Sequence, residues 1–270
     1  MTVPEWSEAF ASLAAVDPLP LPGPAREWAW GGATGAGVKV AVIDSGVDAG
    51  HPRVGGVDGY VAFELDPDSE DGVRLSHEPH EDLVGHGTAC AAIIRSLAPD
   101  VEIHSVRVLG SNLKGQGALF LRGIEWAVEN GLHVANLSLS SKSPTWFGPL
   151  HEVSDLAYFR RTLLVCAANN YPGPTYPSQF ASVVSVAAKP GTDPWALAYN
   201  PSPPVEFAAH GIDVEVAWAG GESIVATGNS FAAPHVAGMA ALVRSKHPEL
   251  TPFQVKAVLH AASENAGPPQ

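Results

Sequence analysis

Short apolar runs and amphipathic stretches alternate along the chain from Pro24 onward. The apolar runs are rich in β-branched residues and lack polar alternation, which is typical of strands that are covered on both faces. We therefore predict five strands of one parallel sheet at Val38–Ile43, Glu102–Leu109, His133–Leu139, Leu163–Ala168 and Val183–Ala188.

Helical patterns lie between and after these runs. Residues Gln116–Asn130 carry apolar side chains at helical spacing, and Gly131 follows at the position of a C-terminal cap. Phe231–Lys246 carries a similar apolar stripe, and Thr251-Pro252 provides a helix start for Gln254–Ala262. This alternation of strands and helices predicts an α/β fold with a doubly wound, mostly parallel central sheet.

The first 24 residues have a different character from the rest. They end in the proline-rich run Asp17–Pro24, where fixed φ angles and missing N–H groups favour an extended chain. We expect residues 1–24 to form an N-terminal extension and residues 25–270 to form one α/β domain.

Composition narrows the range of partners. The chain has 270 residues, of which 46% are hydrophobic, and a formal net charge of −13, which argues against nucleic acids and anionic membranes. Met1–Phe10 holds two glutamates and no secretory signal, so we predict a cytoplasmic protein if Met1 is the natural start. Cys90 and Cys166 lie in apolar stretches, which favours buried free thiols over a disulfide.

Three segments carry candidate chemistry. Val40–Val47 places Asp44 directly after a predicted buried strand, and Gly85–Cys90 places His86 between two glycines. Glycines at such positions let the backbone pass close to another group. Gly228–Gly238 places Ser230 at the start of a helix, where free N–H groups and partial positive charge suit a developing oxyanion.

The order of these residues discriminates among serine hydrolases. Aspartate, then histidine, then serine is the chain order of the subtilisin triad. The α/β-hydrolase order and the chymotrypsin order do not fit, and the chain has no Gly-x-Ser-x-Gly elbow.

The three segments resemble the three signatures of the subtilase family in order and spacing, within a resemblance that runs from about Pro24 to Ser263. The resemblance implies a subtilisin-like three-layer sandwich. It also implies that Ser230 is the nucleophile, that His86 is the general base and then the acid, and that Asp44 fixes the imidazole tautomer.

The family also suggests an oxyanion donor and substrate-binding segments. Val165–Asn170 resembles the strand that ends in the family's oxyanion asparagine, so Asn170 would be the donor, while Asn169 replaces the family's glycine. An extended peptide or protein substrate would bind between two segments as an added strand. These segments are Leu113, Lys114 and Gly115 on one side and Ser138, Leu139 and Ser140 on the other.

The chain departs from secreted subtilisins at the specificity pocket and at a calcium site. Ser140-Ser141 stands where the family commonly has two glycines, and the segment Tyr171–Ser178 is shortened, so we expect a reshaped pocket. Arg53 stands where a secreted subtilisin has a calcium-binding aspartate, and Ile93–Pro99 continues the histidine helix without the loop that supplies the other ligands. We therefore predict no metal and no cofactor.

These observations favour a serine endopeptidase with restricted specificity, such as a peptide-maturing enzyme. Two alternatives stay open, namely a peptide transamidase or macrocyclase that uses the same triad and a non-catalytic peptide-binding module. The extension either leads into the fold or lies over the cleft as an inhibitor. The oligomeric state cannot be read from the sequence.

Overall fold

The computed structural model describes residues 26–69, 72–111, 116–171, 173–202 and 204–266. The predicted extension 1–24 and the predicted substrate-binding residues Leu113, Lys114 and Gly115 therefore lie outside the described residues.

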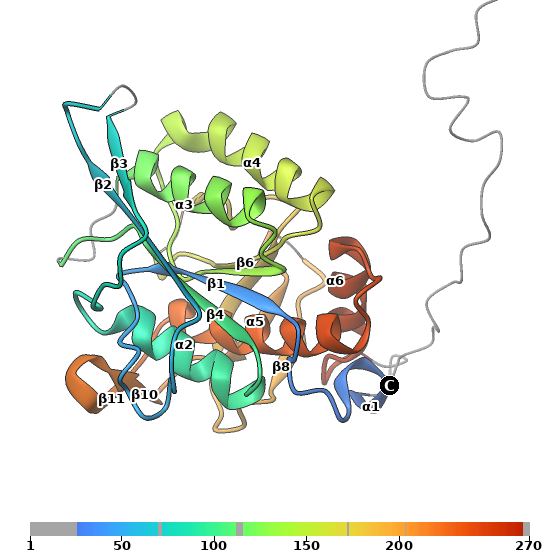
Figure 1. Ribbon diagram of the computed structural model, residues 1–270. Coiled ribbons are helices and arrows are strands. Elements are labelled where there is room, and N and C mark those ends of the chain that lie inside the picture. The colour runs from blue at the N-terminus through green and yellow to red at the C-terminus, as the bar shows by residue number, and fades with distance from the viewer. Residues whose placement is uncertain (1–25, 70–71, 112–115, 172, 203, 267–270) are drawn as a thin grey trace, which may run out of the picture.

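A large sheet forms the middle of the molecule (Figure 1). Within the described residues it has nine strands in the order β3-β2-β4-β1-β5-β6-β7-β9-β8. The strands are β1 Lys39–Asp44, β2 Gly59–Leu65, β3 Val73–Ser76, β4 Glu102–Arg107, β5 Val134–Leu137, β6 Leu163–Ala167, β7 Val184–Lys189, β8 Leu197–Tyr199 and β9 Phe207–His210. A separate antiparallel pair consists of β10 Val214–Trp218 and β11 Glu222–Ala226.

The sheet is parallel except at its two edges. The seven inner strands pair in parallel, in the order β2, β4, β1, β5, β6, β7 and β9. The edge strands β3 and β8 pair with them in antiparallel orientation. The inner strands are buried almost completely, as the uninterrupted apolar runs predict.

Helices cover both faces of the sheet, which gives three layers (Figure 1). α3 and α4 lie on one face, α2 and α5 lie on the other, and each pair covers its own hydrophobic core. The helices are α1 Arg26–Trp30, α2 His86–Leu97, α3 Gly117–Glu129, α4 Phe147–Phe159, α5 Asn229–Lys246 and α6 Pro252–Ala261. The predicted doubly wound, mostly parallel three-layer α/β sandwich is confirmed.

The predicted elements agree with the structure to within one or two residues at most of their ends. All five predicted strands and the three predicted helices are present. Thr251 is the N-cap of α6 and forms a reciprocal capping box with Gln254, and Gly131 adopts a φ of 66° just after α3. In the part of the chain that the structure describes, no helix combines the length and apolarity needed to cross a membrane.

The strand order places a crevice at the carboxyl end of β1. In the sheet β1 lies between β4 and β5. The chain first adds β2, β3 and β4 on one side of β1 and then crosses over to add β5 on the other side. In open α/β sheets such a switch point is where ligands bind. Asp44 ends β1, and the segments that follow β5 and β6 carry Ser138 and Asn170.

Candidate active site

Asp44 and His86 form a buried pair. His86 is the first residue of α2, and its Nδ1 lies 2.9 Å from each carboxylate oxygen of Asp44. Asp44 is 0% exposed and His86 is 8% exposed. Because Nδ1–H donates to the carboxylate, Nε2 is left as the basic nitrogen of the neutral ring.

The glycines on either side of His86 allow the surrounding chain to pack closely against this pair. Gly85 has a φ of 115°, and a Cβ there would lie 2.7 Å from the ring of Trp218. A Cβ on Gly87 would overlap the carbonyl oxygen of Gly46. Both positions therefore require glycine, which confirms the interpretation of these residues from the sequence.

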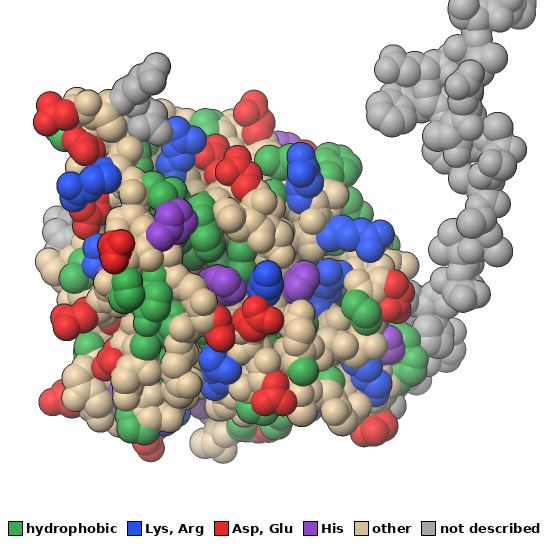
Figure 2. Space-filling view, viewed as in Figure 1, with side chains coloured by type: hydrophobic (Ala, Val, Ile, Leu, Met, Phe, Trp, Pro, Cys, Tyr) green, Lys and Arg blue, Asp and Glu red, His purple; other side chains and the backbone are tan. Residues whose placement is uncertain are grey.

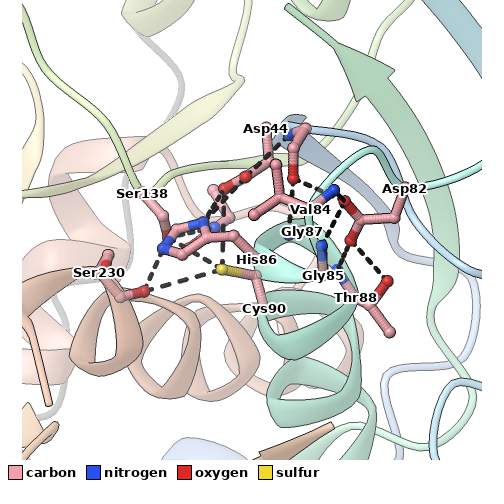
Figure 3. A network of polar contacts seen from close by, with 12 residues as sticks. Asp44, Asp82, Val84, Gly85, His86, Gly87, Thr88, Cys90, Ser138 and Ser230 are labelled. Carbon is pink, nitrogen blue, oxygen red and sulfur yellow. Dashed lines mark hydrogen bonds and ion pairs between the residues drawn. The ribbon is translucent and has the colours of Figure 1, made fainter. Parts of the chain in front are cut away.

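Ser230 lies at the N-terminus of α5, on the other side of the imidazole from Asp44 (Figure 3). His86 and Ser230 line the same cleft, and the ring of Phe231 lies 5.3 Å from the imidazole of His86. The first N–H groups of a helix have no partner within the helix. The backbone N–H of Ser230 can therefore serve, together with the helix dipole, to stabilise negative charge beside Oγ.

The side chain of Asn170 lies beside the same serine. A Cβ placed on Gly228 would be 3.2 Å from Oγ of Ser230 and 3.6 Å from Nδ2 of Asn170, so these two atoms border the same small space. The Oδ1 atom of Asn170 accepts the backbone N–H of Asn229 at 2.9 Å. This bond fixes the amide so that its donor end faces the space beside Ser230.

Comparison with known proteins agrees with this geometry. The profile of the subtilase family matches residues 35–270. The chain belongs to the subtilase family. It is 33% identical to subtilisin BL of Lederbergia lenta over 247 aligned residues, and this alignment covers 87% of each chain. It is 34% identical over 251 residues to subtilisin E of Bacillus subtilis (strain 168), which covers 87% of this chain and 63% of that protein.

A solved structure extends the likeness to the fold. The crystal structure of a cold adapted subtilisin-like serine proteinase superposes with a TM-score of 0.71 at 30% identity, covering 87% of this chain and 85% of that one. The chain is thus a subtilisin-type serine protease, with a candidate triad of Asp44, His86 and Ser230 that is consistent with the family.

In this subtilase the segment with the candidate oxyanion donor is held by Asn229. Its Nδ2 donates to the carbonyl oxygens of Ala168 and Asn169, both at 3.1 Å, and its Oδ1 accepts the N–H of Ala188 at 2.8 Å. The usual family signature has threonine at this position, which cannot make all three bonds. Asn229 therefore ties the start of α5 to the ends of β6 and β7.

Asp82 is a support of the triad that the sequence analysis left unassigned. The carboxylate is 8% exposed and accepts five hydrogen bonds. One donor is the hydroxyl of Ser45, next to Asp44, and two are the backbone and hydroxyl of Thr88 in the first turn of α2 (Figure 3). Asp82 thus joins the loop that carries Asp44 to the helix that carries His86.

Replacing Asp82 by alanine is expected to lower the free energy of unfolding by roughly 3 kcal/mol or more, because several buried donors would lose their acceptor. The measurement is urea unfolding in a Ser230→Ala background, which prevents self-digestion. Glu81→Ala, at an exposed neighbouring position, is the matched control and should change little. Equal stability of the two variants would contradict the assigned role of Asp82.

The environment of His86 sets the pH range of its basic form. Burial lowers the pKa of His86, but the charge of Asp44, its hydrogen bond to Nδ1 and the charge of Asp82 raise it, and the net shift is upward from 6.5. Only the neutral imidazole can act as the base. Because the pKa of His86 is raised, acidification protonates the ring and lowers activity at a higher pH than it would for an unperturbed histidine.

The acidic limb of the kcat/KM profile is therefore expected to be centred above pH 6.5. The profile is to be measured from about pH 5 to pH 9 with a peptide that has no titratable side chain. Asp82→Asn removes one of the raising charges and should move the limb to lower pH. A limb centred below 6.5 in the parent would show that burial, and not the two carboxylates, dominates the pKa.

Ser138 supports the backbone of the nucleophile. Its hydroxyl donates to the carbonyl oxygen of Ser230 at 2.9 Å and accepts from Nδ2 of Asn136 at 2.9 Å. The thiol of Cys90 lies 3.2 Å from the same hydroxyl and 3.9 Å from Oδ2 of Asp44. Burial raises the pKa of the Cys90 thiol well above its ordinary value, so the thiol stays protonated behind the triad.

A cleft of about 530 Å³ opens beside Ser230. It is lined by four of the predicted substrate-binding residues, Ser138, Leu139, Ser140 and Asn169. Leu139 and Ser140 also line a smaller adjoining cavity of about 120 Å³ beside α3. The segment 138–140 therefore borders two neighbouring pockets, as a strand that binds an extended substrate would.

The cleft also contains residues that the sequence analysis did not assign. Trp218 ends β10 and lines the cleft near His86, and Lys142 lies two residues beyond the predicted segment. A search of the residues just beyond each predicted binding segment would have found Lys142.

The position of the family's calcium aspartate is used differently here. The guanidinium of Arg53 donates to the carbonyl oxygen of Glu215 on β10 at 3.3 Å, and its charge lies 3.9 Å from the carboxylate. α2 continues without interruption from His86 to Leu97, as predicted. Across the described ranges, the one converging group of His, Cys and acidic side chains is Asp44, His86 and Cys90, the candidate catalytic group itself.

Proposed function

We propose that this subtilase is an endopeptidase that cleaves peptide bonds through an acyl-enzyme on Ser230 and acts on a restricted set of substrates. One observation carries the proposal. His86, Ser230 and Asn170 line one cleft, and Nδ1 of His86 is held by Asp44 at 2.9 Å. A base, a nucleophile and an oxyanion donor thus meet around one space large enough for a peptide side chain.

The reaction would proceed in two halves. Nε2 of His86 takes the proton of Ser230 while Oγ attacks the peptide carbonyl, and the oxyanion accepts hydrogen bonds from Asn170 Nδ2 and the Ser230 N–H. His86 then gives the proton to the leaving amine, and the C–N bond breaks. Water, activated by His86, hydrolyses the resulting ester and restores Ser230.

Restricted specificity is supported by the walls of the cleft. Where the family commonly has two glycines, Ser140 contributes a side chain to the lining. Asn169 replaces a further glycine, and its Oδ1 accepts the N–H of Tyr171 at 3.2 Å, which closes a tight turn beside the oxyanion donor. These side chains narrow the space that a glycine-lined pocket would leave open.

The proposal is tested by incubating the protein with a mixed-sequence peptide library and reading the products by mass spectrometry, with Ser230→Ala as the control. We expect new termini at a narrow set of sequences with the parent and none with the variant. A parallel reaction with an added peptide amine tests transamidation. Ligated or cyclised products in place of hydrolysed ones would assign the chain to a transamidase, and unchanged peptides in both reactions would contradict catalysis.

A further inference from the structure

One wall of the active-site cleft carries a positive charge. The wall belongs to segment 138–142, which follows β5, and the cleft is also lined by residues 167–170 at the end of β6. Among the described residues that line the cleft, the charged or titratable side chains are His86 and Lys142, and there is no carboxylate. The pocket is therefore cationic at this end, although the whole chain has a net charge of −13.

The ammonium of Lys142 lies over the ring of the residue that follows the candidate oxyanion donor. Its Nζ is 5.5 Å from the centre of the Tyr171 ring, and Tyr171 directly follows Asn170. In the part of the chain that the structure describes, Lys142 has no carboxylate within ion-pair distance, so its charge is balanced only by an aromatic face. An acidic group that entered the cleft would find a cation without a competing carboxylate.

The wall that carries Lys142 is anchored to the segment around Tyr176. The backbone of Ser141 donates to Tyr176 at 2.8 Å and accepts from it at 2.9 Å, which forms a two-bond bridge. The Oδ1 atom of Asn169 is used in its own turn, where it accepts the N–H of Tyr171. The stem of Lys142 thus starts from a fixed backbone, although its end is exposed.

We propose that Lys142 makes this protease prefer substrates with glutamate or aspartate directly before the scissile bond, an inference that rests on the proposed peptidase function. The side chain of that residue branches from the carbon next to the carbonyl that Asn170 would hold. It therefore enters the cleft between the two walls, where its carboxylate can pair with the Lys142 ammonium. At physiological salt, the repulsion from the chain's distant negative charges is screened beyond about a Debye length. The nearby Lys142 ammonium therefore decides which side chain is preferred in the cleft.

The test compares kcat/KM for peptides that differ only before the cleaved bond, with Glu, Gln, Leu or Lys at that position. An exposed charge pair predicts a Glu-to-Gln ratio of roughly 2 to 5 in the parent. Lys142→Gln should bring the ratio to about 1, Lys142→Arg should keep it, and Lys142→Glu should favour the Lys peptide. High salt should lower the parent's ratio by screening the pair.

Arg160→Gln is the matched control, because it removes one exposed positive charge between α4 and β6, at the end of β6 opposite the cleft. It should leave the Glu-to-Gln ratio unchanged. Hydrolysis of the Gln and Leu peptides shows within each variant that the enzyme is folded and active.

The outcomes separate this inference from the proposed function. If the parent cleaves Gln and Leu peptides as fast as Glu peptides, or if the Glu preference survives in Lys142→Gln, the role of Lys142 is overturned and the peptidase stands. If no peptide is cleaved and Ser230 does not react with a fluorophosphonate, both are overturned.

Discussion

Replacing Ser230 by alanine is expected to lower kcat about a million-fold while KM changes little. The loss removes the nucleophile, so only binding and the oxyanion donors remain to accelerate attack by water. The magnitude is the one measured for the triad of subtilisin itself. There, removing the serine or the histidine alone lowers kcat by this factor, and removing the aspartate lowers it by a factor about a hundredfold smaller. Asp44→Ala should therefore retain more activity than Ser230→Ala or His86→Ala.

Non-additivity is the sharper part of this prediction. Because Ser230 and His86 act as one unit, the double variant should be no slower than either single variant. Single-turnover kinetics, with enzyme in excess of the peptide and above KM, give the rate of the chemical step for each variant, and circular dichroism shows that the fold is kept. A further large loss in the double variant would mean that the two residues act independently, which the shared cleft does not allow for.

Replacing Asn170 by leucine is expected to lower kcat about 100- to 1,000-fold, a range measured for the equivalent donor of subtilisin itself. The substitution removes Nδ2, which faces the space beside Oγ of Ser230, and leaves the triad in place. The donor acts on the oxyanion that forms in the transition state, so KM should change little. Steady-state kinetics with the best library peptide separate the two parameters.

Asn169 provides the matched control for this prediction. It is the same residue type in the adjacent position, but its Oδ1 accepts the N–H of Tyr171 and its side chain lines the pocket. Asn169→Leu should therefore act mainly through KM. If it lowers kcat more than Asn170→Leu does, the oxyanion donor has been assigned to the wrong residue of the pair.

The candidate catalytic residues could be named from the sequence because each lies in a local pattern that is informative by itself. Asp44 ends a buried strand, His86 lies between glycines and Ser230 begins a helix, and the order of the three excludes other hydrolase folds. The strands were predicted equally well, because a strand that is buried on both faces has an uninterrupted apolar sequence.

Elements at the surface were missed for the opposite reason. α4 exposes Phe147 and Phe159, so its apolar residues do not form a clean stripe. β3 is a four-residue edge strand with a half-exposed pattern, and such short segments carry little periodicity. Both elements are stabilised by the sheet and helices they pack against rather than by their own sequence.

Supporting residues were missed because no periodic pattern marks them and because some of their partners are distant in sequence. Asp82 is part of an acidic cluster that is typical of a solvated loop, yet it is buried because Ser45 and Thr88 converge on it. Asn229 differs from the family signature, and only the fold brings Ala168 and Ala188 to its amide. Hydrogen bonds across many tens of residues leave no trace in a local pattern.

The most direct test is reaction with a fluorophosphonate, in which Oγ of an activated serine displaces fluoride and forms a bond to phosphorus. Intact mass spectrometry and peptide mapping are expected to show one adduct per chain, on Ser230. The labelling rate should fall as pH drops through the pKa of His86, and His86→Ala should label far more slowly. Absence of an adduct, an adduct on another serine, or equal labelling of His86→Ala would contradict a nucleophile at Ser230 that is activated by His86.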